Sequence, residues 1–538
     1  MKAYAKGESA PALLEETIGA NLERTVARFG EREALVEAAS GRRWSWNQFN
    51  ADVDALAKGL IAAGVQAGDR VGIWAPNCAE WTLTQFATAK IGVILVNVNP
   101  AYRTHEYAYA VNHSQMRMLI TVTGFKTSNY RAMVEATRED TVTLQRVVFL
   151  DTDDWAQLLA QGAGISDAAL AERLAATDSG DAINIQYTSG TTGYPKGAVL
   201  SHRNILNNGY QVTGMINLTE EDRLCIPVPF YHCFGMVMGN LGCVSRGTTM
   251  VIPAPGFDPE TTLKVVAEER CTGLYGVPTM FIAMQNHPNF ANYDLDTLRT
   301  GIMAGSICPV EVMRRCVEDM GMSDVSIAYG MTETSPVSCQ TRDDDDFERR
   351  TSTIGRVHPH VEIKVVDPAT GQTLERGETG EYCTRGYSVM LGYWNDQVKT
   401  NAAIDEEGWM HTGDLAVMRE DGYCNIVGRI KDMVIRGGEN IYPAEIEEFL
   451  YHHPDIEDVS VIGVPDEKYG EVICACIRMK AGRAPLSVEA IREYSTGHLA
   501  HYKIPAYVQI LEEFPTTVTG KIRKNQLRED AAARLHLP

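Results

Sequence analysis

Residues 187–197 read YTSGTTGYPKG and follow an apolar run at 182–186 that predicts a buried strand. Glycine lets a backbone approach phosphate closely, and Ser and Thr hydroxyls can surround phosphate oxygens together with backbone N–H groups. Lys196 adds a positive charge. The stretch does not fit the Walker pattern, because Pro195 rather than glycine precedes the lysine. A flexible linker is the alternative, but a position between a predicted strand and a predicted helix favours a phosphate-binding loop.

On both sides of this loop, β-branched runs alternate with stretches of helical period. The predicted strands are 146–150, 182–187, 249–252, 325–329 and 361–366, and the predicted helices are 46–63, 260–269 and 309–320. Such alternation predicts an α/β fold with largely parallel sheets. Residues 360–430 contain short strands separated by Gly, Pro and Asp, which predicts a small antiparallel unit.

The pattern changes at residues 428–431 into a self-contained α+β unit. Its predicted helices are 443–452 and 487–499, and its predicted strands are 459–464 and 472–479. We therefore expect two domains. Residues 1–429 form stacked, mostly parallel sheets with helices and the antiparallel unit, and residues 430–538 form a small α+β domain.

Composition and charge narrow the class of protein. The 538 residues are 44% hydrophobic and 22% charged, as in ordinary globular proteins. The 49 Lys+Arg against 70 Asp+Glu give a formal charge of −21, which argues against binding nucleic acid or an anionic membrane. The acidic run 343–346 is expected to be a solvated loop rather than a metal site.

Cysteines and apolar runs indicate the compartment. The 12 cysteines contain no C-x-x-C pair, and Cys474 and Cys476 alternate as expected of buried strand residues. The N-terminus lacks the apolar core of a secretory signal, and the apolar run 91–98 is too short to span a membrane. We therefore expect a cytoplasmic protein in a reducing environment, with no stable membrane insertion and no nucleic-acid partner.

Five motifs in order give a specific resemblance. YTSGTTGYPKGAVLSH (187–202) resembles the phosphate loop of the adenylate-forming superfamily, which includes acyl-CoA synthetases, luciferases and peptide-synthetase adenylation domains. Four later stretches resemble its other motifs: YGMTETSP (329–336), GWMHTGDLA (408–416), GRIKDMVIRGGENIYPAEIE (428–447) and PTTVTGKIRK (515–524). The resemblance implies a two-step reaction in which a carboxylate and ATP give acyl-AMP and pyrophosphate, and CoA then takes the acyl group.

The resemblance also implies roles for single residues. Glu333 would be the Mg²⁺ ligand, Asp414 and Arg429 would contact ribose, and Lys521 would bridge carboxylate and α-phosphate. The further nucleotide-binding residues implied are Thr188, Ser189, Gly190, Thr191, Thr192, Gly193, Lys196, Gly305, Ser306, Tyr329, Gly330, Met331 and Thr332. Thr188 and His232 would join Glu333 and Lys521 as catalytic residues, with His232 beside the acyl-adenylate at the entrance for pantetheine.

The family's C-terminal domain is mobile, which implies a hinge at Lys431. Rotation about it would exchange the Lys521 face for a CoA-binding loop, implied to comprise Arg436, Gly437, Gly438, Glu439 and Asn440. The implied acyl pocket comprises His232, Phe234, Met238, Gly239, Val277, Met280, Met303 and Val337. Methionine-rich apolar walls suit a flexible alkyl chain or a plain aryl ring.

The stretches 274–281, 327–337 and 385–394 most resemble medium-chain acyl-CoA synthetases, which favours a medium-chain fatty acid. Short-chain, branched and aryl acids stay open, and the methionines could be ordinary core residues. Alternatives of another class are a luciferase-like oxygenase, a peptide-synthetase adenylation domain, which a carrier domain would normally follow, and a non-catalytic nucleotide-binding protein. The number of copies in the assembly is left open, with a homodimer as one alternative.

Overall fold

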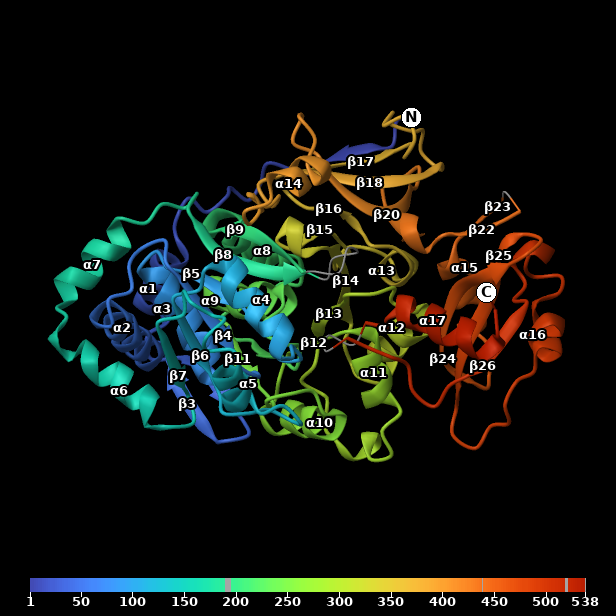
Figure 1. The fold of residues 1–538 in the computed structure, drawn as a ribbon. Helices are drawn as coiled ribbons and strands as arrows, with labels where there is room; N and C mark the ends of the chain where they lie inside the picture. Colours follow the sequence, from blue (N-terminus) through green and yellow to red (C-terminus); the bar gives the residue numbers. More distant parts are fainter. Residues whose placement is uncertain (189–194, 438, 518–520, 538) are drawn as a thin grey trace.

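The computed structural model describes residues 1–188, 195–437, 439–517 and 521–537, and its chain forms four β-sheets (Figure 1). A nine-stranded sheet has the order β16 (Arg356–Val357), β15 (Val337–Gln340), β14 (Asp324–Gly330), β13 (Thr300–Ala304), β12 (Gly273–Gly276), β10 (Arg223–Cys225), β11 (Thr249–Ile252), β2 (Glu33–Glu37) and β3 (Arg42–Ser45). Its six central strands are parallel, and the antiparallel pairs lie at its two ends.

A second parallel sheet carries the strand before the glycine-rich loop. Its order is β19 (Gly392–Tyr393), β9 (Lys196–Ser201), β8 (Ala182–Thr188), β5 (Ile94–Asn97), β4 (Arg70–Trp74), β6 (Met118–Thr121) and β7 (Arg146–Phe149). Strands β8 and β9 pair antiparallel, so the loop joins two strands of a hairpin. The prediction that a helix directly follows the loop is wrong, because α8 (His202–Met215) begins only after β9, where Ser201 caps it.

Helices pack around these two sheets and bury a large main core and a smaller second cluster. The helices are α1 (Ile18–Phe29), α2 (Trp46–Ala62), α3 (Ala79–Lys90), α4 (Thr104–Ser114), α5 (Tyr130–Ala136), α6 (Asp153–Gln161), α7 (Asp167–Ala175), α9 (Gly242–Arg246), α10 (Pro259–Glu268), α11 (Pro278–Gln285), α12 (Val310–Glu318), α13 (Phe347–Ser352) and α14 (Gln397–Ala403). Of these, α4 and α5 contribute to the second cluster. A π-helix, η2 (Phe234–Leu241), and the 3₁₀ turns η1 (Gly162–Gly164), η3 (Phe290–Asn292) and η4 (Thr332–Thr334) complete this part.

The predicted antiparallel unit is confirmed. It is a five-stranded sheet of order β1 (Tyr4–Lys6), β17 (Val361–Val366), β18 (Thr379–Gly386), β20 (Met410–Met418) and β21 (Cys424–Arg429). Every pair in it is antiparallel, and the N-terminal strand β1 forms one edge. The α/β class with mostly parallel sheets is therefore correct.

The C-terminal unit, residues 430–538, gathers at one end of the molecule (Figure 1, orange to red). It contains β22 (Val434–Arg436), β23 (Glu439–Ile441), β24 (Ile456–Asp466), β25 (Gly470–Met479), β26 (Tyr507–Ile510), η5 (Ile430–Asp432), η6 (His501–Lys503), α15 (Pro443–Tyr451), α16 (Val488–Ser495) and α17 (Lys524–Leu535). Side chains of β25 alternate between two apolar clusters, and Cys474 and Cys476 are buried in one of them as predicted. The predicted helix 487–499 is too long, because Gly497 turns the chain with φ +85°.

The acidic run 343–346 is more structured than the predicted solvated loop. Asp345 is buried and accepts hydrogen bonds from Arg342 N at 2.8 Å and from the Tyr423 hydroxyl. Asp346 caps α13 through Arg349 N at 2.8 Å. These carboxylates complete local backbone structure.

Candidate nucleotide and acyl site

Glu333 lies on the 3₁₀ turn η4, directly after β14 of the nine-stranded sheet. It is close to the end of β8, which belongs to the second sheet. Its Oε1 accepts hydrogen bonds from the Tyr393 hydroxyl at 2.9 Å and from Thr188 Oγ1 at 3.3 Å. The Lys196 ammonium lies 4.9 Å from the centre of the Tyr393 ring. The hydrogen bonds from Tyr393 and Thr188, both made between described residues, use Oε1. Oε2 can therefore accept a hard cation. Residues on three strands and a turn thus converge on one buried carboxylate.

The backbone after β14 holds Glu333 in place. A Cβ on Gly330 would lie 1.7 Å from the Pro336 carbonyl oxygen, so this close approach requires glycine. Thr334 Oγ1 donates to Pro336 O at 2.6 Å, and Met390 N donates to Glu333 O at 2.9 Å. The turn is therefore anchored on both sides of the carboxylate.

Asp414 is a second buried carboxylate, at the beginning of the β20–β21 pairing. Its Oδ2 accepts from the Tyr329 hydroxyl at 2.7 Å, and its Oδ1 accepts from Arg429 Nε at 2.8 Å. A carboxylate has about four lone-pair positions, so two remain for a diol such as ribose. Burial, and then the negative charge of Asp414, raise the pKa of Tyr329 well above its usual range, so the phenol stays a donor.

Lys521 brings the C-terminal unit to these carboxylates. A Cβ placed on Gly305 would lie 4.0 Å from Lys521 Cε and 3.2 Å from Val277 Cγ1. Burial, and then the nearby Arg429, lower the pKa of Lys521, while Asp414 and Glu333 oppose that shift. The structure therefore places Lys521 at the end of β13, within the electrostatic reach of both carboxylates.

His232 lies beside Lys521 and is neutral. Burial, and then the Lys521 charge, lower its pKa to about 4. Its Nδ1 accepts from Phe234 N at 3.2 Å, which leaves Nε2 to carry the proton of the neutral ring. His232 as a residue is half-buried.

The predicted acyl residues pack into one apolar cluster. It contains Phe234, Met238, Val277, Met280, Met303 and Val337, each at most 5% exposed. Phe234, Met238 and Gly239 lie on the π-helix η2, an irregularity that is frequent at functional sites. The Phe234 ring lies 5.4 Å from that of Tyr275, whose hydroxyl donates to Met238 O at 3.3 Å. Whether these residues bind an acyl group stays a prediction.

The predicted CoA loop lies on a surface hairpin of the C-terminal unit, β22–β23. Gly437, Glu439 and Asn440 are exposed, and the Arg436 guanidinium lies 4.3 Å from the centre of the Tyr469 ring. The structure does not bring this hairpin to Glu333. Lys431, the predicted hinge, is exposed in η5 between β21 and β22.

Several predicted residues fall elsewhere. Ser189, Gly190, Thr191, Thr192, Gly193 and Gly438 lie outside the described residues. Ser306 is exposed, Thr332 is buried, and Met331 is half-buried beside Glu333. Tyr393 was missed by sequence reasoning, although it lies in the stretch 385–394 that indicated chain length. The only signal in the sequence was that Tyr393 follows Gly392 in a stretch with the pattern of a short strand.

The chain belongs to the family of AMP-binding enzymes. The family model for AMP-binding enzymes matches residues 22–394, and the model for their C-terminal domain matches 445–521. Among similar proteins, YngI of Bacillus subtilis (strain 168) is 48% identical over 98% of this chain and 99% of its own length. Its name assigns it provisionally to the acyl-CoA synthetases.

Two further relatives have defined names. The mitochondrial medium-chain acyl-CoA ligase ACSF2 of Danio rerio is 44% identical over 99% of this chain and 91% of its own length. The crystal structure of the anthranilate CoA ligase AuaEII in complex with anthranoyl-AMP superposes with a TM-score of 0.88 at 26% identity. That match covers 98% of this chain and all of the other.

Proposed function

We propose that this chain is an ATP-dependent carboxylic acid–CoA ligase acting on medium-chain fatty acids. In the first step, a carboxylate oxygen attacks the α-phosphorus of ATP, acyl-AMP forms and pyrophosphate leaves. In the second, the CoA sulfur attacks the acyl carbon, its proton is lost, and AMP leaves. The single observation that carries this proposal is Lys521 beside Gly305, within the field of Glu333 and Asp414.

Lys521 would supply positive charge where two anions approach each other. A fatty carboxylate and the triphosphate repel, and a preorganised ammonium in a partly desolvated site offsets that repulsion as charge develops. Asp414 would hold the ribose through its two remaining lone-pair positions, with Arg429 and Tyr329 fixing its orientation. Lys196 and Thr188 would contact phosphate at the end of the hairpin.

Glu333 would hold Mg²⁺ through Oε2. The residues fit the ion, because a buried carboxylate with one oxygen engaged and one available is a hard ligand, and Mg²⁺ takes its other ligands from phosphate and water. Bound there, the ion would neutralise phosphate charge. Tyr393 and Thr188 would keep the carboxylate oriented through their bonds to Oε1.

The arrangement corresponds to the first step, and the second would need the C-terminal unit, residues 430–538, to move. The exposed β22–β23 hairpin would then replace Lys521, with Lys431 as the hinge, and Arg436, Gly437, Glu439 and Asn440 would line the path of pantetheine. A hinge of few residues can absorb such a rotation. His232, neutral beside Lys521, would face the acyl carbon in both steps.

The acid is inferred from two supports. The predicted acyl residues on η2 and β13 are buried and apolar, which suits an alkyl chain. The relative ACSF2 bears the name of a medium-chain ligase. Short-chain, branched and aryl acids are the alternatives, and the anthranilate ligase shows that this fold accepts an aryl acid.

The cellular location and the number of copies in the assembly can be tested as well. No helix in the described residues has both the length and the apolar character of a membrane span. We propose a cytoplasmic location, although the relative ACSF2 is named as mitochondrial. Fractionation would separate the two locations, and light scattering would determine whether the enzyme is a homodimer.

Pyrophosphate release over a panel of carboxylic acids, with and without CoA, tests the function. We expect release with straight-chain acids of medium length, and acyl-CoA and AMP only when CoA is added. Best turnover with benzoate-type or short acids would contradict the assignment of the acid. No release with any acid would contradict the ligase itself and leave a nucleotide-binding protein.

A further inference from the structure

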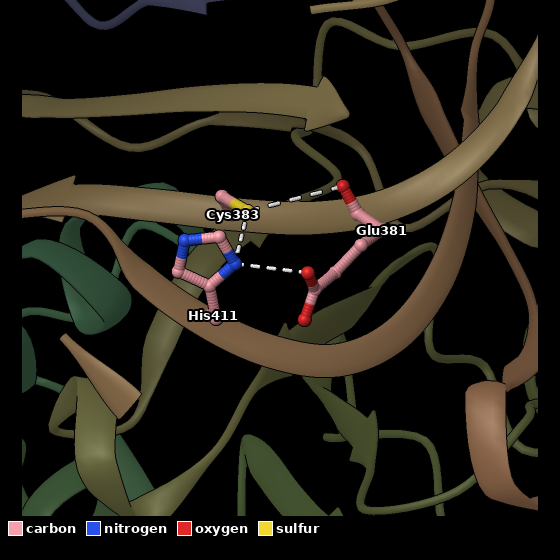
Figure 2. Close-up of side chains that lie close together, drawn as sticks. All are labelled: Glu381, Cys383 and His411. Carbon is pink, nitrogen blue, oxygen red and sulfur yellow. Dashed lines mark hydrogen bonds and ion pairs between the residues drawn. The ribbon is translucent and has the colours of Figure 1, made fainter. Parts of the chain in front are cut away.

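Three side chains with the chemistry of metal ligands meet on the antiparallel sheet, away from Glu333. Glu381 and Cys383 lie on one face of β18, and His411 is the cross-strand partner of Cys383 on β20. Figure 2 shows the three side chains directed toward one another. Their ligand atoms all lie within 4.8 Å of one another, the one such group among the described residues.

The two distances from His411 can be compared with those of a tetrahedral zinc site. His411 Nδ1 lies 3.5 Å from Cys383 Sγ and 2.9 Å from Glu381 Oε2. With Zn–N near 2.0–2.1 Å and Zn–S near 2.3 Å, a tetrahedral N–S edge is about 3.5 Å and an N–O edge about 3.3 Å. The first distance fits, and the second needs a side-chain movement of about 0.4 Å. Water would fill the fourth position.

The outer partners of these ligands are also in place. His411 Nε2 lies 3.5 Å from Asp405 Oδ2. Asp405 is itself fixed, since its Oδ1 accepts from Trp409 N and Glu407 N, each at 2.9 Å. Glu381 Oε1 accepts from Gly413 N at 3.0 Å. Metal-binding His residues usually donate their other N–H to a carboxylate, and ligating carboxylates are usually hydrogen-bonded as well.

We propose that Glu381, Cys383 and His411 bind a zinc ion that braces the turn at residues 412–414. Glu381 would use Oε2 for the ion and keep Oε1 on Gly413 N, one residue before Asp414. The ion displaces the Cys383 thiol proton and the proton that His411 shares with Glu381, and both pass to the buffer. The proposed zinc site is separate from the ATP and acid site. Its test therefore does not depend on the ligase assignment.

Calorimetry and cobalt absorption on the chelator-treated full-length chain test the site, with no acid or ATP present. We expect one equivalent of Zn²⁺ to bind and Co²⁺ to give a thiolate-to-metal absorption band. Cys383→Ser and His411→Ala should each weaken binding by at least about 100-fold, and Asp405→Asn by about tenfold. Cys78→Ser, at a half-buried cysteine outside this group, is the control and should bind as the parent does.

A melting-temperature series guards against a variant that fails to fold. Zinc should raise the melting temperature of the parent and of Cys78→Ser, but not that of Cys383→Ser, because only a ligand of the folded state stabilises it. Should Cys383→Ser not fold, His411→Ala carries the same comparison. Absence of stoichiometric zinc, or undiminished binding in Cys383→Ser, would overturn the proposal and leave an ordinary His–Glu ion pair beside a buried thiol.

Discussion

At the scale of single residues, Lys521 has the most direct expected effect. Lys521→Ala should lower acyl-adenylate formation by about 10²–10³-fold, the size seen when one preorganised group that stabilises developing charge is removed. Thioester formation from supplied acyl-AMP should change far less, because the lysine would have left the site by then. Single-turnover assays of each half-reaction measure the two effects.

An exposed lysine of the same unit provides the comparison. Lys480 donates to Pro454 O on a surface turn, so Lys480→Ala removes an equal charge away from Gly305. It should leave both half-reactions nearly unchanged. If Lys521→Ala instead slowed both halves equally, the residue would be structural.

Tyr393 tests how the magnesium ligand is oriented. Tyr393→Phe removes the 2.9 Å hydrogen bond to Glu333 Oε1 and keeps the ring under Lys196. We expect the Mg²⁺ concentration for half-maximal adenylation to rise about tenfold, as for other partners of metal ligands. Tyr293→Phe removes a surface bond of the same type, to Glu260 at 3.3 Å, and should have no effect. If Tyr393→Phe required the same Mg²⁺ concentration as the parent, Tyr393 would not be the residue that orients Glu333.

The site residues differ in whether a short stretch of sequence is enough to identify them. Glu333, Asp414 and Lys521 each lie in a short motif, so sequence alone indicated them. Tyr393 lies 60 residues from Glu333 along the chain, and its role depends on β19 pairing with β9. No spacing rule links those two strands, so only the folded chain reveals the contact.

At the scale of elements, strands and helices with strong periodicity were predicted well. The bounds of β11 and β17 agree with prediction, and α2 ends one residue early. The failure at 196–201 has a physical cause, since the apolar residues of KGAVLS suit a short strand as well as a helix start. Pairing with β8 decides between them, and pairing is not local.

The connection at η5 carries the prediction on domain movement. Lys431→Pro fixes φ at residue 431 at about −65°, a value that a 3₁₀ turn such as η5 already uses, and removes the freedom to rotate about that bond. Adenylation should be nearly preserved, because the present arrangement already holds Lys521 in place, whereas thioester formation should fall by at least about tenfold. Rates of the two half-reactions check this. Normal thioester formation by Lys431→Pro would count against rotation at this hinge.

At the scale of the whole molecule, two buried histidines set a pH dependence of stability. Burial lowers the pKa values of His202 and His358 to about 3, against about 6.5 in an unfolded chain. Their contribution is complete above pH 6.5 and is lost as the pH falls toward 3, because the unfolded chain binds protons that the native one does not. Each should cost about 1.4 kcal/mol per pH unit in that window.

One variant separates the contribution of His358 to this pH dependence of stability from the contribution of the carboxylates. His358→Gln can keep a hydrogen bond with Gln340 Oε1, now 2.9 Å from His358 Nε2, through its amide group. The difference in unfolding free energy between parent and variant should therefore shrink or reverse from pH 7 to pH 5. Urea unfolding at several pH values measures it, and parallel curves would show that His358 is not neutral in the native state.

The contact between the C-terminal unit and the rest of the molecule supplies the last prediction. Glu448 on α15 lies in this interface, where burial raises its pKa, while the charge of His452 and then the backbone N–H of Val310, at the start of α12, oppose the shift. A raised carboxyl pKa means that the ionised side chain is less stable in this interface than in water. Because α12 follows the Gly305 segment, burial of Glu448 opposes the arrangement in which Lys521 is inserted.

Glu448→Ala should therefore shift the population of the C-terminal unit severalfold toward that arrangement, because it removes the cost of burying the carboxylate. Fluorescence energy transfer between dyes on the two parts would show a shorter or narrower distance, and thioester formation would slow while adenylation would not. Glu445→Ala is the matched control, since Glu445 on the same helix pairs with Lys503 inside the C-terminal unit at 2.6 Å. Equal distance changes in both variants would mean that α15 stability, not the contact with α12, controls the position of Lys521.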